Sequence, residues 1–458
     1  MSETNALKTF MTDVANAIRS KTGKTDKLVP INFPNEILSI ETSSGSDEDV
    51  ELIEKDINFY DYDGTLLHSY TLEELNALTS LPPLPSHEGL TCQEWNWTLS
   101  DLKALNRKMD VGATYITDDG ATRIHIKLVG KRWNTIPLHF AQTVSNGVQV
   151  NWGDGSSVET VSGTGQVNPT HSYASEGEYV ISLKVLDGTL TFGDVTVSPY
   201  SCLIASGIVA NRGYVNSVIE INIGSGVESL GTSCFNQFQS MLKVSIPNTV
   251  TLLNDSPFNY NTKLMACIIP KSITALAKNS FYYCQNLRIV SFPCELTYIG
   301  GQSFMYNNSL KKAIFPPQLS WDTTNGACFS MCPQIEEIYL PETMITNLPK
   351  NCFANCNSLK KVELHGDTEY KLLANAFVSC QGIEKIVVKG AKKTFYTSCF
   401  GNCYSISVLD FTECDSVVSS DTGTLYGTGF EIRVPLALVD SYKSATEWKN
   451  YKDYIVGV

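Results

Sequence analysis

The sequence predicts a multi-domain chain: a small N-terminal helical module, a small α+β domain, a β-sandwich, and a C-terminal solenoid with short parallel strands. Three observations predict this fold class. A single helical stripe lies near the start, apolar and polar residues alternate strictly in the middle, and a phenylalanine recurs every 23–25 residues in the second half. With 458 residues, 43% of them hydrophobic, the chain can build several cores.

Residues 1–42 predict the helical module. Its apolar side chains recur at helical spacing at Leu7, Phe10, Met11, Val14 and Ile18. One narrow stripe cannot form a core in so small a unit, so we expect a virion-attachment or oligomerisation module; docking on the next domain is the alternative. The polar, acidic residues 42–51 read as a linker.

Residues 52–130 predict the small α+β domain. INFYDYDGTLLHSY (57–70) predicts a hairpin around its Asp-Gly pair, and ATYITDDGATRIHIKL (113–128) predicts a second one. Two short amphipathic helices are expected in TLEELNALTS (71–80) and SDLKALNRKM (100–109).

Residues 133–198 predict an all-β unit, because Tyr179, Ile181, Leu183 and Val185 alternate with residues that can face solvent. The segments WGDGS (152–156) and HSYASEGEYVISLKV (171–185) resemble the PKD domain, an immunoglobulin-like sandwich found in surface proteins. That resemblance implies a spacer or a weak contact module.

Residues 203–458 carry the repeat that predicts the solenoid. Six positions after each repeat phenylalanine stands Met, Leu or Ile, and small or apolar residues follow at nine and eleven. The last pair predicts a short strand in a parallel sheet, with the phenylalanine on the opposite wall. The phenylalanines are Phe235, Phe258, Phe281, Phe304, Phe329, Phe353, Phe377 and Phe400.

The repeat units, such as SFYYCQNLRIVSFP (280–293) and CFANCNSLKKVELH (352–365), resemble the BspA-type leucine-rich repeat. Residues 432–456 are similar to the terminal segment of that family, which implies a C-terminal cap from about residue 430. The resemblance implies an extracellular adhesin or interaction surface without catalytic function.

Most of the 14 cysteines lie in the repeat region, three residues after or one residue before a repeat phenylalanine. Such positions favour a small buried side chain, so we expect buried free thiols. Disulfides between coils are the alternative. The CxxxC pairs lack the CxxC spacing and partner histidines of a zinc site.

One motif could carry chemistry. FYDYDGTLL (59–67) matches the DxDGT signature of haloacid-dehalogenase-like phosphatases, in which Asp61 would be the nucleophile and Asp63 the acid/base. The following stretch is too short for the doubly wound domain of that family, so we expect a hairpin turn. The scattered histidines form no pair or HExxH motif, and we expect no catalytic residue, cofactor or metal.

The charge pattern excludes nucleic acid as a partner. Residues 200–458 balance at 20 basic and 20 acidic side chains, so the net charge of −13 comes from residues 1–199. The start lacks the pattern of a secretory signal, and no apolar run reaches the roughly 18 residues of a membrane span, so we expect neither standard export nor membrane insertion.

The residues eight and ten positions after each phenylalanine should point outward from the sheet. This face is apolar at Ile268, Ile289 and Ile314 and mixed in charge afterwards. Four tyrosines should also cluster on neighbouring coils and bind sugar or protein, unless they pack between coils. The candidate ligand contacts are Tyr260, Tyr282, Tyr283, Tyr306, Lys312, Glu337, Tyr339, Lys361 and Lys385.

Two N-terminal segments indicate where the chain works. ANAIRSKTGKTDKLVPINFPNEI (15–37) resembles a short module at the start of bacteriophage minor structural proteins, and residues 57–103 are similar to a domain that recurs beside it in phages of gut bacteria.

We therefore expect a non-enzymatic bacteriophage virion structural protein of the tail, fibre or decoration type. It would be assembled in the host cytoplasm and exposed on the particle surface as a homo-oligomer. The N-terminal modules would contact other virion proteins, and the solenoid would bind a host-surface protein or glycan. A BspA-type bacterial cell-surface adhesin is the alternative, and a phosphatase a remote one.

Overall fold

The computed structural model describes residues 52–130, 134–193, 203, 216–365, 369–390, 393–421, 425 and 429–458. The predicted helical module at 1–42 lies outside the described residues. The chain from Glu54 to Val458 forms one compact unit. Within the described part, no helix is both long and apolar enough to cross a membrane.

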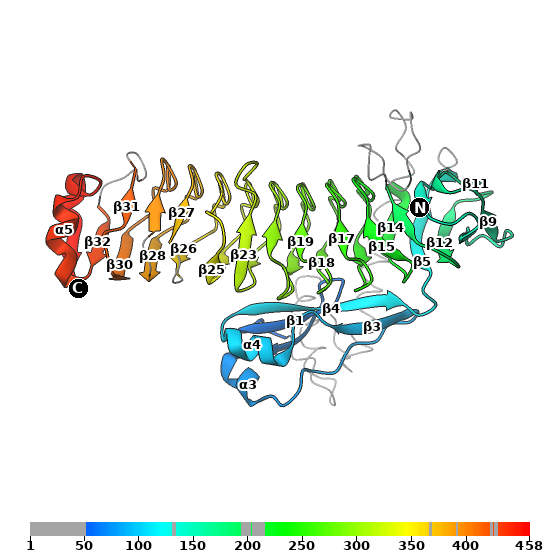
Figure 1. Ribbon diagram of the computed structural model, residues 1–458, viewed down its shortest axis with the longest axis horizontal. Helices are drawn as coiled ribbons and strands as arrows, with labels where there is room; N and C mark the ends of the chain where they lie inside the picture. The colour runs from blue at the N-terminus through cyan, green and yellow to red at the C-terminus, as the bar shows by residue number, and fades with distance from the viewer. Residues whose placement is uncertain are drawn as a thin grey trace, which may run out of the picture. The chain divides into compact units, whose positions relative to one another are not determined.

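The small domain holds a four-stranded sheet and two short helices (Figure 1). The predicted first hairpin is confirmed, because β1 and β2 pair antiparallel around a turn at Asp61–Thr65. Strand β1 also pairs with β4 in parallel, and β3 pairs with β4 antiparallel. Both predicted helices form, and each is capped by a threonine side chain at its start. The elements are β1 (Ile57–Tyr60), β2 (Leu66–Tyr70), α3 (Leu72–Ala77), β3 (Leu90–Trp95), α4 (Leu99–Leu105) and β4 (Met109–Thr117).

The predicted second hairpin at 113–128 is wrong. Its turn forms, with the Gly120 amide donating to the Thr117 carbonyl at 3.0 Å. The next strand, β5 (Thr122–Leu128), nevertheless pairs with β12 (Gly177–Val185) and β14 (Val218–Asn222) instead of β4. The reason is apolar matching, because Ile124 and Ile126 are fully buried in the core of those strands.

Residues 134–193 form short strands, as their alternation predicted. Two sheets, in the orders β16-β14-β5-β12-β8-β9 and β10-β7-β13-β15-β17, enclose one core that includes Trp152 and Phe192. The first pairs of solenoid strands belong to the same sheets, so the predicted boundary near residue 200 is crossed by hydrogen-bonded strands. We call β5–β13 the amino-terminal cap. Its other strands are β6 (Thr135–Pro137), β7 (Phe140–Gln142), β8 (Val148–Asn151), β9 (Glu159–Val161), β10 (Gly165–Val167), β11 (Thr170–Ser172) and β13 (Leu190–Phe192).

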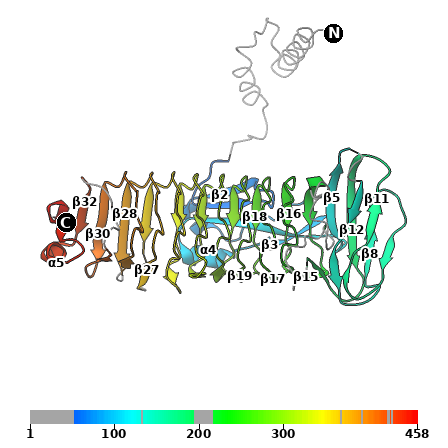
Figure 2. The ribbon, with the colours of Figure 1, turned by 90° about the horizontal axis from the view of Figure 1, so that it is seen from above.

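The repeat region coils into a solenoid with two rows of parallel strands (Figures 1 and 2). The first row is the predicted one, and we call its outward side the sheet face. It comprises β14, β16 (Lys243–Ser245), β18 (Ala266–Ile268), β20 (Ile289–Ser291), β22 (Lys312–Ile314), β24 (Glu337–Tyr339), β26 (Lys361–Leu364), β28 (Lys385–Gly390), β30 (Val408–Cys414) and β32 (Glu431–Val434).

A second row of strands was not predicted, because most of its strands have only two residues and give no clear alternation. It comprises β15 (Val227–Leu230), β17 (Leu252–Leu253), β19 (Ala275–Leu276), β21 (Tyr298–Ile299), β23 (Gln318–Trp321), β25 (Thr343–Met344), β27 (Tyr370–Leu372), β29 (Lys393–Phe395) and β31 (Ser419–Ser420).

The repeat phenylalanines form a continuous stack along the interior. All eight are fully buried, and the rings of Phe353 and Phe377 lie 5.3 Å apart with an interplanar angle of 11°. Non-glycine residues at positive φ lie two positions before and two after each of these phenylalanines. These tight bends place the phenylalanine amides opposite carbonyls of the next coil, as in the 2.8 Å bond from Phe353 to Ala376.

The carboxyl end of the solenoid is covered as predicted. Tyr442 and Trp448 lie with ring centroids 5.9 Å and 5.5 Å from that of Phe411, a buried residue of the last coils. The Trp448 indole donates to the Val418 carbonyl at 2.6 Å. The covering elements are η4 (Leu436–Leu438), α5 (Val439–Ser444), η5 (Lys449–Tyr454) and β33 (Ile455–Gly457).

Candidate ligand-binding surface

The first half of the sheet face is not available to a ligand, because the small domain packs on it. Ile268 and Ile314 are only 4% exposed and share a core with Phe59, Trp97 and Val111 of the small domain. The prediction that this apolar part of the ladder faces solvent is therefore wrong. The strand alternation was read correctly, but the outward side chains are buried by another part of the same chain.

Polar groups fix the register of this contact. The Trp97 indole donates to the Phe292 carbonyl at 2.7 Å, and the Asn96 amide donates to the Ile269 carbonyl at 3.0 Å. Gly112 contacts Ile268 so closely that a Cβ atom there would lie 2.4 Å from the isoleucine Cγ2. Buried bonds of this kind allow one arrangement of the two surfaces and exclude others.

Lys312, a predicted ligand contact, belongs to this internal contact. Its side chain is only 13% exposed and its ammonium group lies 3.1 Å from Asp110 and 2.9 Å from Glu54. Burial alone would lower the pKa of Lys312, but the charges of Asp110 and Glu54 raise it. Lys312 is therefore excluded as a contact for an external ligand in this structure.

The sheet face from β26 onward is not covered by the small domain, and its charges form ion pairs. Lys361 contacts Glu363 at 2.6 Å, Lys385 contacts Asp410 at 2.8 Å, and Lys389 bridges Glu363 and Glu413. The side chains of Lys361 and Lys385 remain 53% and 38% exposed. Both predicted contacts are thus accessible, on different strands.

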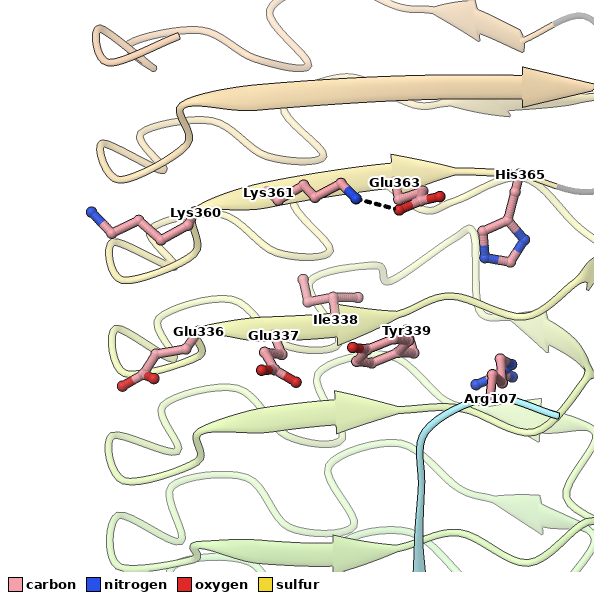
Figure 3. A pocket seen from close by; sticks show the side chains of 9 residues that line it. All are labelled: Arg107, Glu336, Glu337, Ile338, Tyr339, Lys360, Lys361, Glu363 and His365. Carbon is pink, nitrogen blue, oxygen red and sulfur yellow. Dashed lines mark hydrogen bonds and ion pairs between the residues drawn. The ribbon is translucent and has the colours of Figure 1, made fainter. Parts of the chain in front are cut away.

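A pocket of about 560 Å³ lies where the covered part of the sheet face ends (Figure 3). Strand β24 pairs with β22 and strand β26 pairs with β28, but within the fully described stretch 216–365 no ladder joins β24 to β26, as none joins β16 to β18 or β20 to β22. The pocket lies between β24 and β26. It is lined by Arg107, Glu336, Glu337, Ile338, Tyr339, Lys360, Lys361, Glu363 and His365.

Ile338 is less buried than its equivalents on the other coils. The equivalent residues on other coils, nine positions after the phenylalanine, are buried, whereas Ile338 is only partly buried. Its neighbour Tyr339 is also half-buried and lies under the ammonium group of Lys108, 5.9 Å from the ring centroid. Burial raises the pKa of Tyr339, and the charge of Glu337 raises it further. The pocket therefore has an apolar and aromatic strip between charged groups.

Arg107 supplies the wall of the pocket that comes from the small domain. It follows Asn106, the left-handed residue that ends α4. The guanidinium donates from Nη2 to the Phe315 carbonyl at 2.7 Å and lies 3.6 Å from Glu342. Burial lowers the pKa of His365 on the opposite wall, and the charge of Arg107 lowers it further, so this imidazole is neutral at neutral pH.

Comparison with known protein families decides the nature of the coils. Residues 212–321 and 314–407 match the family model described as the BspA type leucine-rich repeat region, with six copies. The coils form a leucine-rich-repeat solenoid. No curated protein matches the chain.

Several solved leucine-rich-repeat structures are similar to this chain. A leucine-rich repeat protein from Bacteroides ovatus shares 17% identity over 47% of this chain and 63% of its own, with a TM-score of 0.36. The T. pallidum leucine-rich repeat protein shares 21% identity over 41% of this chain and 83% of its own, with a TM-score of 0.31. A leucine-rich cell surface protein from Faecalibacterium prausnitzii shares 15% identity over 51% and 94%, with a TM-score of 0.20. The chain thus spans less than two thirds of the Bacteroides ovatus protein.

The four predicted tyrosines do meet on neighbouring coils of the leucine-rich-repeat solenoid. The ring of Tyr283 lies 4.8 Å from that of Tyr260 and 5.7 Å from that of Tyr306, and Tyr282 lies 5.6 Å from Tyr306. All four are half-buried, and they pack against one another across the coils, as the alternative interpretation anticipated. Ligand binding by this cluster stays a prediction.

The DxDGT segment forms the predicted hairpin turn, and its carboxylates are engaged. Asp61 is 4% exposed and accepts hydrogen bonds from the Tyr115 hydroxyl and the Tyr62 amide, both at 2.8 Å. Its other oxygen lies 2.7 Å from His87. Asp63 pairs with Lys243 of the solenoid at 3.2 Å. These contacts give both aspartates structural partners and leave the phosphatase hypothesis without support.

The repeat cysteines are buried, as predicted, and their thiols have a structural role. At the position three after the phenylalanine, the Sγ of Cys332, Cys356 and Cys380 donates to the phenylalanine carbonyl of the preceding coil, at 3.0–3.4 Å. Burial raises the pKa of Cys332 to about 12, which keeps it a thiol. Among the described residues, no group of three or more His, Cys, Asp or Glu could hold a metal.

The structure brings three predicted contacts, Glu337, Tyr339 and Lys361, into one pocket and leaves Lys385 on another strand. Sequence reasoning missed the other lining residues. Glu336 and Lys360 stand seven positions after Phe329 and Phe353, so extending the outward ladder by one position would have found them. Nothing in the repeat could indicate Arg107, because it reaches the pocket only through docking of the small domain.

Proposed function

We propose that the chain is a non-enzymatic binding protein of a bacteriophage virion, which presents its leucine-rich-repeat solenoid to a host-surface protein or glycan. One observation carries the binding role: the sheet face from β26 onward stays uncovered, and a pocket lined by charged, apolar and aromatic side chains lies where the small domain ends. A packed solenoid interior, filled by stacked phenylalanines, holds these side chains in fixed positions. Preformed sites bind with little loss of conformational entropy.

The place on a virion is supported by sequence. Residues 15–37 and 57–103 resemble segments of phage structural proteins, and the first lies where an attachment module is expected. We assign contacts with other virion proteins and homo-oligomerisation to the N-terminal modules. The solenoid would then be exposed on the particle surface.

For residues 134–193 we propose an immunoglobulin-like domain of the PKD type. Trp152 is buried, and the turn after it uses Gly153 and Gly155 at φ of 81° and 85°. Asp154 lies 2.7 Å from His171, and the Tyr173 hydroxyl donates to the Trp152 carbonyl at 2.7 Å. Because strands of the amino-terminal cap pair with strands of the solenoid, we propose that this domain is fixed on the end of the solenoid and is not a free spacer.

Adsorption of particles tests the binding role. Particles carrying the chain with both Lys361→Gln and Lys385→Gln should assemble normally but adsorb to their propagating host about tenfold more slowly. The matched control is Lys263→Gln with Lys443→Gln, two exposed lysines away from the uncovered sheet face. Equal adsorption of all three particles would refute the proposal.

Whether the protein belongs to a virion or to a bacterial cell surface needs a separate test, because a BspA-type bacterial adhesin would present the same binding surface. The match of residues 212–407 to that repeat type is compatible with either location. Antibodies against the solenoid should label purified particles at fixed stoichiometry. Labelling of the bacterial envelope without labelling of particles would assign the protein to the cell surface.

A further inference from the structure

The charges that line the pocket between β24 and β26 cancel. Three carboxylates, from Glu336, Glu337 and Glu363, face three cations, from Arg107, Lys360 and Lys361, and His365 is neutral. An ionic ligand of either sign would meet repulsion as well as attraction at such short range. An uncharged polar ligand avoids that conflict.

Most of these charges already have partners, yet they keep hydrogen-bonding capacity. Glu337 contacts Lys108 at 3.3 Å, Lys360 contacts Glu384 at 3.2 Å, and Lys361 contacts Glu363 at 2.6 Å. A carboxylate offers about four acceptor sites and an ammonium group three donors, so each pair leaves some unused. Arg107 differs from these pairs: in the described part of the chain its Nε and Nη1 make no hydrogen bond but are buried, and its Nη2 donates to the Phe315 carbonyl. Hydroxyl groups, which both donate and accept, match this mixed set.

The strip formed by Ile338 and Tyr339 adds a surface of another kind. Figure 3 shows both residues on β24, between Glu337 on one side and Arg107 on the other. The C–H face of a pyranose ring packs against an aromatic ring because the ring face is electron-rich. Rows of hydroxyls on one side and C–H groups on the other are characteristic of sugars. A volume of about 560 Å³ lies within the range of small-molecule sites.

We infer that this pocket binds a neutral glycan, with Tyr339 under one sugar ring, Glu336 and Lys361 bonded to hydroxyls of the glycan, and Arg107 as the wall that the small domain supplies. This inference rests on the proposed function and names its ligand class. Because Arg107 comes from the small domain, the site is complete only while that domain is docked on the solenoid. The docked small domain therefore has a role in recognition.

The test titrates the full-length chain with defined probes and follows binding by saturation-transfer NMR. The neutral probes are methyl β-glucoside, methyl β-galactoside and N-acetylglucosamine; galacturonate is the acidic probe, glucosamine the cationic one and a Glu-Lys dipeptide the peptide probe. At least one neutral probe should bind, and Tyr339→Ala should weaken it about tenfold. Tyr396→Ala is the matched control, because Tyr396 is also half-buried with a lysine ammonium 5.5 Å from its ring.

Tyr339→Ala also removes a contact with Lys108 of the small domain, so a second variant is needed that leaves this contact intact. Glu336 is exposed, so Glu336→Ala should leave the unfolding temperature unchanged and still weaken the neutral probe, whereas the exposed Glu295→Ala should not. Binding of only the charged or peptide probes, binding of none, or equal binding by the pocket variants would overturn the inference. If the neutral probes fail but particles with Lys361→Gln and Lys385→Gln still adsorb more slowly than the control particles, the proposed binding function stands and only the neutral glycan is refuted.

Discussion

The buried pair of Lys312 and Asp110 offers the sharpest test of how the small domain is held on the solenoid. In Lys312→Met, Asp110 loses its cation while it remains buried, with a side chain only 5% exposed. Loss of one partner of a buried pair costs about 3–5 kcal/mol. We expect about 3 kcal/mol, at the low end of that range, because the Asn58 amide still donates to Asp110 at 3.1 Å.

The pH dependence of the stability lost in Lys312→Met shows whether the uncompensated Asp110 carboxylate causes it. Burial raises the pKa of Asp110, and Lys312 opposes that effect, so removing the lysine raises the pKa further. The folded variant then binds a proton that the unfolded chain, with an Asp pKa of about 3.9, does not bind at neutral pH. Its stability therefore increases as pH falls through the folded pKa. The loss of stability of Lys312→Met relative to the unaltered protein should be largest near about pH 7 and smaller near about pH 4.

Urea unfolding followed by tryptophan fluorescence measures this loss, with Trp97 reporting on the contact itself. The double variant Lys312→Met with Asp110→Asn should recover most of the stability, because the buried charge is gone. Lys361→Met, which breaks an exposed pair, should cost no more than about 1 kcal/mol. A loss below about 1 kcal/mol for Lys312→Met near pH 7, or one that grows on acidification, would show that the pair does not work as described.

Two further predictions concern the solenoid interior. Phe353→Ala should lower the free energy of unfolding by about 3–5 kcal/mol, because this ring is fully buried 5.4 Å from that of Phe329 and 5.3 Å from that of Phe377. Tyr404→Ala, at a side chain 67% exposed, should change it by less than about 0.5 kcal/mol in the same denaturation experiment, and similar losses would contradict the stack. Iodoacetamide should label half-buried Cys92 and Cys294 before the buried repeat cysteines, although burial raises even the pKa of Cys294 to about 11. Peptide mass spectrometry gives the order, and early labelling of Cys356 would mean that the coils open.

The repeat was the most predictable part of the fold, because the same pattern of apolar residues occurs eight times at nearly constant spacing. Phe353 and the pair Val362 and Leu364 are buried where the spacing placed them. The exception on this wall is Ile338, half-buried beside the pocket between β24 and β26. Its residue type does not mark it, since valine and isoleucine at the same repeat position are buried on other coils.

Contacts between distant segments were beyond the sequence. Lys312 and Asp110 stand 202 positions apart, and each alone looks like an ordinary surface charge. The three isoleucines of the ladder were expected to face outward, and only the docked small domain shows that they are covered. The turn at Gly120 was predictable from local chemistry, but the partner of the strand after it was decided by the distant strands β12 and β14.

Where the sheet face is uncovered, towards the carboxyl-terminal end of the solenoid, whole coils can be added or lost without changing the rest of the fold. Among the described residues, the strands after β26 pair only with strands of neighbouring coils and of the terminal cover, and none pairs with the amino-terminal cap or the small domain. Gain or loss of one coil would change the reach of the surface by about 4.8 Å. Variation in length could therefore accumulate in this segment during evolution, while the pocket at its base keeps its walls.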